Sequence, residues 1–263
     1  MTFQPVLPIG GFAGWSFLKR TLPAQQAAQQ ALSVNQRDEA YFRDKIGKID
    51  TADQLVSDKR LLRIALTAFG LEADVNNTAF IRKVLQDGTI RDGGLANRLA
   101  DKQYQKLSAA FGFGDFSVPR NKLSDFADKI LATYRARRFE TAVGEQNNTY
   151  RLALNAEREI PALAAGTMSE TAKWFTILGN PPMRQVMQAA LGLPKSISAI
   201  DIDQQVAVMK TRAEAAFGNA TVSQFADPQK LDALVRRYLV RADVQDMSAV
   251  TSPAAMALQL LRR

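Results

Sequence analysis

The stretch "ALTAFGLEAD", residues 65–74, contains a short pattern that the chain uses again. An alanine, a bulky apolar residue and a glycine follow one another, and the same pattern ends at each of four glycines: Gly70, Gly112, Gly192 and Gly218. Glycine at the end of an apolar helical segment adopts the left-handed conformation that closes a helix. The pattern therefore predicts four helix ends, each with a bulky side chain buried in the last turn.

Two of these helices have matching starts. Asp58 precedes Gly70, and Asn180 precedes Gly192, by the same 12 residues, and both residue types are good N-caps. The apolar residues between cap and glycine follow the i, i+3, i+4, i+7, i+8 spacing of one amphipathic face. They are Leu61, Ile64, Ala65, Ala68 and Phe69 in one helix and Met183, Val186, Met187, Ala190 and Leu191 in the other. We interpret residues 51–113 and 171–218 as two related helical units. The alternative is that alanine-rich helices ending in glycine resemble one another by chance.

The fold class follows from the rest of the chain. Beyond residue 20 almost every segment has a helical pattern, and no stretch alternates apolar and polar residues as a half-buried strand does. A hydrophobic content of 46% and a charged content of 23% are typical of globular proteins. We expect an all-α, bundle-like array of two related helical units joined by a long helix, with little or no β structure.

Four regions are expected along the 263 residues: an N-terminal aromatic, Pro/Gly-rich arm (1–20), a first helical unit (21–120), a long connecting helix or helix pair (121–166), and a second helical unit with a C-terminal helix (167–263). The prolines and glycines of the arm argue against a continuous helix there. The first helix is predicted to begin after Thr21, with Pro23 in its first turn, and to run to Gly47.

Smaller features complete this prediction. The polar stretch "GEQNNT", residues 144–149, leaves open whether the connecting region is one helix or two, and Pro161 is expected to end either version. A helix over 78–88 is expected with Asn77 as its cap. The pair Ser252-Pro253 predicts the start of a short final helix, which either docks on its own chain or binds a partner.

The composition excludes several kinds of chemistry. The chain has no cysteine and no histidine, so disulfides, thiolate or histidine metal sites and Ser-His-Asp catalysis are absent. The carboxylates form no convincing catalytic pair, because candidates such as Glu157 and Glu159 stand two apart on a helix and point to different sides. We therefore expect a protein that is not an enzyme and has no cofactor and no metal.

Basic residues exceed acidic ones, giving a net charge of +8. The densest cluster of candidate binding residues is Arg135, Arg137 and Arg138, and further clusters are Arg236-Arg237 with Arg241, and Arg262-Arg263. Such arginines lie most often on solvated helix faces or near helix C-termini. Binding of nucleic acid or another acidic surface is the alternative, which the lack of a recognisable nucleic-acid motif makes the weaker one.

The arm supplies the second group of candidate partner-binding residues: Phe12, Trp15 and Phe17. These aromatic side chains either pack into the protein's own core or anchor a protein partner. No run of 18 or more apolar residues occurs, so no membrane span is expected. Lys19 and Arg20 follow the apolar start, whereas a secretory signal places its positive charges first, so we expect a cytoplasmic protein with leaderless export left open.

With these segments in view, the chain resembles an alphaproteobacterial family catalogued as domain of unknown function 1217, often encoded in flagellar gene clusters. The segments that carry the resemblance are "GGFAGWSFLKRT" (10–21), "LLRIALTAFGLEADVNNTAFIRKVLQDGT" (61–89), "LANRLADKQYQKLSAAFGFGDF" (95–116) and "MRQVMQAALGLP" (183–194). The resemblance brings no catalytic residues with it. It implies a helical protein that assists flagellar assembly or rotation through protein contacts, with neither partner nor oligomeric state identified.

Overall fold

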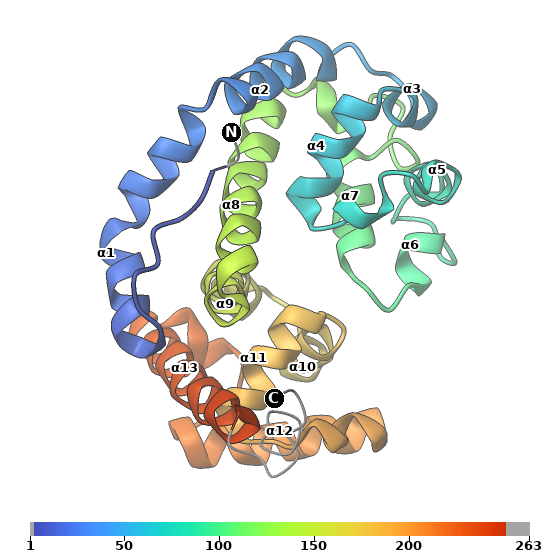
Figure 1. Cartoon of the computed structure of the whole chain (residues 1–263). Coiled ribbons are helices and arrows are strands. Elements are labelled where there is room, and N and C mark those ends of the chain that lie inside the picture. The colour runs from blue at the N-terminus through green and yellow to red at the C-terminus, as the bar shows by residue number, and fades with distance from the viewer. Residues whose placement is uncertain (1–2, 251–263) are drawn as a thin grey trace, which may run out of the picture. The chain divides into compact units, whose positions relative to one another are not determined.

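The computed structural model describes residues 3–250, and all regular structure within that range is helical (Figure 1). Thirteen α-helices and four short 3₁₀ helices occur there, and this part of the chain contains no strand. The expected all-α fold is therefore confirmed. The predicted final helix after Ser252-Pro253, and the pair Arg262-Arg263, lie outside the described residues.

The contacts between residues divide the chain into two compact units. The first contains the described residues through Pro5 together with Thr21–Ala142, and the second contains Val6–Arg20 together with the chain from Val143 onward. We expected residues 1–20 to form a separate arm and 121–166 to form a connector. The observed division instead assigns most of the arm to the second unit and passes through a helix between Ala142 and Val143.

The first unit contains most of the short helices. Its elements are the C-terminal part of α1 (Gly11–Gln30), α2 (Ser33–Ile46), α3 (Ala52–Ser57), α4 (Lys59–Phe69), η1 (Glu72–Asp74), α5 (Thr78–Asp87), α6 (Leu95–Arg98), α7 (Gln103–Phe111), η2 (Arg120–Lys122) and most of α8 (Phe126–Gln146). Helix α4 is central, because Leu61, Ile64 and Ala65 are fully buried and it contacts α2, α3 and α7. The core continues into α8 through Leu131 and Tyr134.

The second unit is built around α11. Its elements are the start of α1, the end of α8, α9 (Asn148–Ala165), α10 (Glu170–Leu178), α11 (Pro181–Leu191), η3 (Lys195–Ala199), α12 (Ile202–Phe217), η4 (Ser223–Ala226) and α13 (Pro228–Val250). Helix α11 contacts α9, α10, α12 and α13. The predicted apolar face of α11 is buried, including Met183, Val186 and Met187.

The repeated glycine pattern ends four helices, as the sequence predicts. Gly70, Gly112, Gly192 and Gly218 have φ angles of 73°, 69°, 69° and 79° and end α4, α7, α11 and α12. At the two best-matched ends, Leu71 N donates to Leu66 O and Leu193 N to Gln188 O, each at 2.9 Å. These bonds define Schellman motifs, and both leucines fold back into the core.

The predicted N-caps are confirmed at α4 and α11 but only in part at α5. Asp58 accepts from the backbone N–H groups of Arg60 and Leu61, and Asn180 accepts from that of Met183. Asn77 occupies the cap position of α5 without making a cap bond, because its side chain donates to Asp74 instead. The two central helices thus begin and end by the same local chemistry, which supports a common plan for the two units.

Helices α8 and α13 extend this common plan. The segments "ILATYRAR" (130–137) of α8 and "LVRRYLVR" (234–241) of α13 share two apolar residues, a tyrosine and an arginine at equal spacing. Both tyrosines, Tyr134 and Tyr238, are buried. The shared arginine is Arg137 in α8 and Arg241 in α13, and each lies over the glycine that ends the central helix of its unit. A β-carbon on Gly70 would stand 3.2 Å from Arg137 Nη1, and one on Gly192 would stand 2.1 Å from Arg241 Nη1. An arginine at a helix C-terminus complements its negative end.

The expected disruption of helix by the prolines and glycines near the N-terminus is wrong. Helix α1 begins at Gly11, runs through Gly14 and Pro23, and ends at Gln30, and a separate helix α2 starts at Ser33. Gly14 lets the backbone of Ile9 approach helix α1 closely, because a β-carbon on Gly14 would stand 1.9 Å from Ile9 O. Burial of Trp15 and Leu18 stabilises the helix against the local cost of these residues.

The connecting region forms two helices. Asn147 is extended, with φ −149° and ψ 99°, and its side chain caps α9 by accepting from Tyr150 N. This separates α9 from α8, so the single-helix alternative does not hold. Pro161 lies inside α9 rather than at its end, and the helix continues to Ala165 because Leu163 and Ala164 pack into the core.

Candidate functional site

The three aromatic residues proposed for partner binding differ in exposure. Trp15 is only 3% exposed, and its ring packs against that of Tyr150 with centroids 5.9 Å apart. Phe12 and Phe17 are half-buried, and the guanidinium of Arg236 lies 4.5 Å above the Phe12 ring. Trp15 therefore belongs to the core of the second unit, which is the first of the two alternatives considered from sequence.

Tyr150 fixes the start of α1 within the second unit. Its hydroxyl donates to Gly11 O at 2.6 Å. Burial, together with the negative charge of Asp243, raises the pKa of Tyr150, so its hydroxyl keeps the proton that it donates. The Asp243 carboxylate in turn lies 3.0 Å from the position of a β-carbon on Gly11. Residues 9–12 are thereby held against α9 and α13.

Beside this contact α13 carries exposed apolar side chains. Val240 and Val244 are 50% and 58% exposed and stand one helical turn apart. Val240 lies on the same face of α13 as Arg236 and Asp243, which contact the start of α1. Ile9, just before that helix, is 55% exposed. We call Ile9, Val240 and Val244 the valine patch.

The arginine cluster of α8 has its contacts inside the first unit. Arg135 makes a two-pronged ion pair with Glu39, with Nε 2.7 Å from Oε1. Arg138 Nη1 donates to Asn35 Oδ1 at 2.6 Å and to Tyr134 Oη at 3.0 Å. The side chain of Arg137 is largely buried over the end of α4. The three residues thus have structural contacts and do not form one free basic surface.

A buried acid on α2, which sequence reasoning missed, organises more of these arginines. Asp38 Oδ1 lies 2.7 Å from Arg60 Nε, and Asp38 Oδ2 lies 3.5 Å from Arg63 Nη2. Tyr134 donates to the same carboxylate over 3.5 Å. A charge buried in an ion pair with several partners holds neighbouring helices together at a fixed distance. The sequence gives no hint of this, because Asp38 stands in a polar stretch of α2.

The second unit contains a cluster whose composition resembles a catalytic set. Lys173, buried, donates to Ala164 O at 2.8 Å, to Ser223 Oγ at 2.5 Å and to Glu170 Oε1 at 3.3 Å. Burial alone would raise the pKa of Glu170, but hydrogen bonds from Ser223 and from the Val222 backbone N–H lower it below 4.5. All three donor hydrogens of Lys173 are engaged, so it has no capacity left to activate Ser223. The cluster ties η4 to α10.

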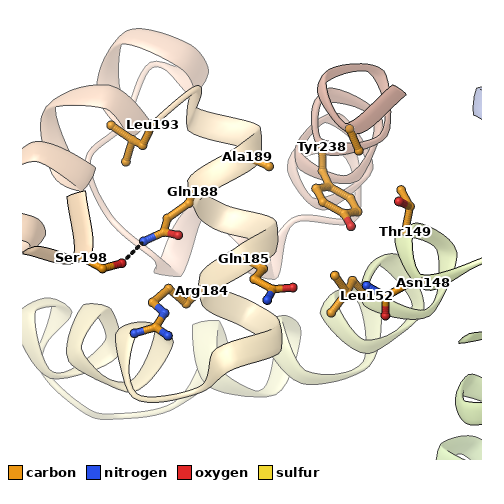
Figure 2. Close-up of a pocket in the computed structure, with 11 residues that line it drawn as sticks. Asn148, Thr149, Leu152, Arg184, Gln185, Gln188, Ala189, Leu193, Ser198 and Tyr238 are labelled. Carbon is orange, nitrogen blue, oxygen red and sulfur yellow. Dashed lines mark hydrogen bonds between the residues drawn. The ribbon is translucent and has the colours of Figure 1, made fainter. Parts of the chain in front are cut away.

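A cavity of about 500 Å³ opens in the second unit. Its lining comes from four elements and from the residue after Gly192: Asn148, Thr149 and Leu152 of α9, Arg184, Gln185, Gln188 and Ala189 of α11, Leu193, Ser198 of η3, and Tyr238 and Ala242 of α13. Figure 2 shows Gln185 and Tyr238 on the side of α11 that faces α9, and Arg184, Gln188 and Ser198 on the other side. The cavity is lined mainly by uncharged polar groups.

The cavity contains no carboxylate in its lining, and its one charged side chain is that of Arg184. Across the described residues, no group of three or more acidic, histidine or cysteine side chains is arranged to hold a metal ion. Within the same range no helix is sufficiently long and apolar to cross a membrane. Sequence reasoning did not select any cavity residue, since amide and hydroxyl side chains are too common to stand out.

A comparison with known protein families identifies the family of this chain. The model of a family described as "Protein of unknown function (DUF1217)" matches residues 68–231, which is more than half of the chain. The chain therefore belongs to this family, as its resemblance in sequence indicated. A comparison with curated proteins found no match.

A solved structure shares the fold. The crystal structure of protein AGR_C_984 from Agrobacterium tumefaciens matches with a TM-score of 0.74 and 24% sequence identity, over 92% of this chain and 99% of that one. At this identity the similarity supports the arrangement of helices and not a shared activity.

Proposed function

We propose that this protein acts by binding another protein, without catalysis, and that it assists flagellar assembly or rotation. The observation that carries the first part is the valine patch. Ile9, Val240 and Val244 expose apolar surface next to the contact between α1 and α13, although the second unit has a well-formed core of its own. Val240 and Val244 are neighbours on one helix, and neighbouring exposed apolar side chains are typical of protein contacts.

The flagellar part rests on the family resemblance alone. The patch supports a protein partner of any identity, so the two parts can fail separately. The alternative of nucleic-acid binding is less well supported, because Arg135 and Arg138 pair within the first unit, and Arg237 Nε donates to Ala190 O at 2.7 Å at the end of α11. Arginines held in this way contribute little to the release of counterions from a phosphate backbone.

The test uses point variants, because deleting the start of the chain would also remove the buried Trp15. Val240→Glu with Val244→Glu places two charges in the valine patch. The matched control is Val34→Glu, since Val34 is 49% exposed on α2 of the first unit. Each version replaces the chromosomal copy in a flagellated bacterium that encodes the chain, and swimming in soft agar and co-purifying proteins are measured.

We expect the double variant to swim less and to lose co-purifying flagellar proteins, while Val34→Glu behaves as the unaltered protein. Both variants must keep the thermal unfolding temperature of the unaltered protein. Loss of a non-flagellar partner in the double variant would retain the binding proposal and overturn the flagellar one. An unchanged set of partners in the double variant would overturn the role of the patch.

A further inference from the structure

The cavity of the second unit is lined at three positions whose counterparts in the first unit include two arginines. Helices α4 and α11 correspond through their caps and glycines, and α8 and α13 correspond through the shared Tyr-x-x-Arg spacing. By this correspondence Gln185 matches Arg63, Ala242 matches Arg138, and Tyr238 matches Tyr134. The three residues of the second unit all line the cavity.

In the first unit the two matching arginines are longer and pair with other side chains of that unit. Arg63 reaches the buried Asp38, and Arg138 donates to the Tyr134 hydroxyl and to Asn35. Gln185 and Ala242 are shorter than these arginines, which leaves more room beside Tyr238.

The cavity also has a charged side chain at a position that is apolar in the first unit. The position of Arg184 on α11 corresponds to Leu62 of α4, which is fully buried. Arg184 is half-buried and lines the cavity. With no acidic residue in the lining, a ligand carrying negative charge would supply the carboxylate or phosphate oxygens that a guanidinium binds best.

The remaining lining favours a small polar molecule. Asn148, Gln185 and Gln188 contribute amide groups, and Thr149 and Ser198 contribute hydroxyl groups. Leu152 and the Tyr238 ring add apolar surface on the side facing α9 (Figure 2). A volume of about 500 Å³ lies in the range of cavities that hold small molecules.

We propose that this cavity binds a small polar molecule that carries an oxyanion, with Arg184 binding the anionic group and with Gln188 and Ser198, on the same side of α11, binding the rest. The site is separate from the valine patch and does not depend on the proposed function. Carboxylates and phosphates share the chemistry that Arg184 recognises, and the experiment below distinguishes them.

The test titrates the isotope-labelled full chain with citrate, inorganic phosphate, adenosine 5′-monophosphate and glucose, each to about 10 mM, which detects millimolar affinity. Backbone amide resonances of Arg184, Gln188 and Ser198 report on this side of the cavity. We expect at least one oxyanion probe to shift them and glucose, which is neutral, to leave them in place. If no oxyanion probe shifts these resonances, the proposal is overturned.

Two variants separate the cavity from general attraction of anions to a basic protein. Arg184→Gln should weaken binding by about tenfold or more, as expected for loss of a charged hydrogen bond, while Arg212→Gln on the exposed face of α12 should not. Equal effects of the two glutamine variants would refute the site.

Discussion

The end of α11 offers a quantitative test of the fold, since one glycine there meets two separate requirements. Gly192 has φ 69°, and a β-carbon on it would stand 2.1 Å from Arg241 Nη1. Gly218 ends α12 in the same unit with φ 79°, but a β-carbon there would meet no atom within 4 Å. Comparing the two glycines separates backbone strain from the contact with the arginine.

The expected magnitudes follow from these contacts. Placing alanine in the left-handed conformation costs about 1–2 kcal/mol, and this is the whole effect expected for Gly218→Ala. Gly192→Ala must also displace the Arg241 guanidinium from the negative end of α11, which costs about 0.3–1 kcal/mol more. In the background of Arg241→Ala, the substitution Gly192→Ala should cost no more than Gly218→Ala does.

Urea unfolding followed by tryptophan fluorescence measures these differences in the appropriate unit. The chain has two tryptophans, Trp15 and Trp174, and both are buried in the second unit. A shift in midpoint at constant slope reports the change in free energy of unfolding. If Gly192→Ala costs no more than Gly218→Ala, or if Arg241→Ala leaves its cost unchanged, Arg241 does not bind the end of α11 as described.

Two further predictions concern the second unit. Trp15→Ala should lower the free energy of unfolding by about 3–5 kcal/mol, because it leaves a cavity in the core. Urea unfolding followed by the fluorescence of Trp174 measures this loss. A loss below about 1 kcal/mol would contradict the burial of Trp15. The pKa of Glu170 in the folded protein lies below its ordinary value of 4.5. The charged form of Glu170 therefore stabilises the folded unit above pH 4.5, and this contribution is lost as the pH falls through the pKa of the folded protein. Glu170→Gln should reduce the dependence of stability on pH between about 5 and 3; an unchanged dependence in the melting temperature would contradict the hydrogen bonds assigned to Glu170.

The proposed binding sites were predicted from sequence only in part. Phe12, Trp15 and Phe17 directed attention to the N-terminal segment, but the exposed apolar side chains there are Ile9 and two valines of α13, more than two hundred residues away in the chain. Only the folded chain brings the start of α1 against α13. The arginines of α8 stood out by charge density, yet their partners, such as Glu39, lie on a distant helix and cancel that charge locally.

Helix ends are where the sequence alone was sufficient. Whether Gly70 or Gly192 closes a helix depends on atoms within a few residues, because the left-handed conformation and the bonds of the Schellman motif are local. The same holds for Asp58 and Asn180, whose side chains reach only the next turn. Helix content and the positions of the two central helices could therefore be predicted without knowing what packs against them.

Tertiary structure decided the features that involve long-range packing. Pro23 and Pro161 are unfavourable inside helices by local rules, but each loses only a limited number of hydrogen bonds, and burial of neighbouring side chains outweighs that loss. The cavity beside Tyr238 depends on which side chains from α9, α11 and α13 meet in space, since Gln185 and Ala242 are unremarkable in sequence. Local bonding is encoded in neighbouring residues, whereas burial and cavities depend on residues that only the fold brings into contact.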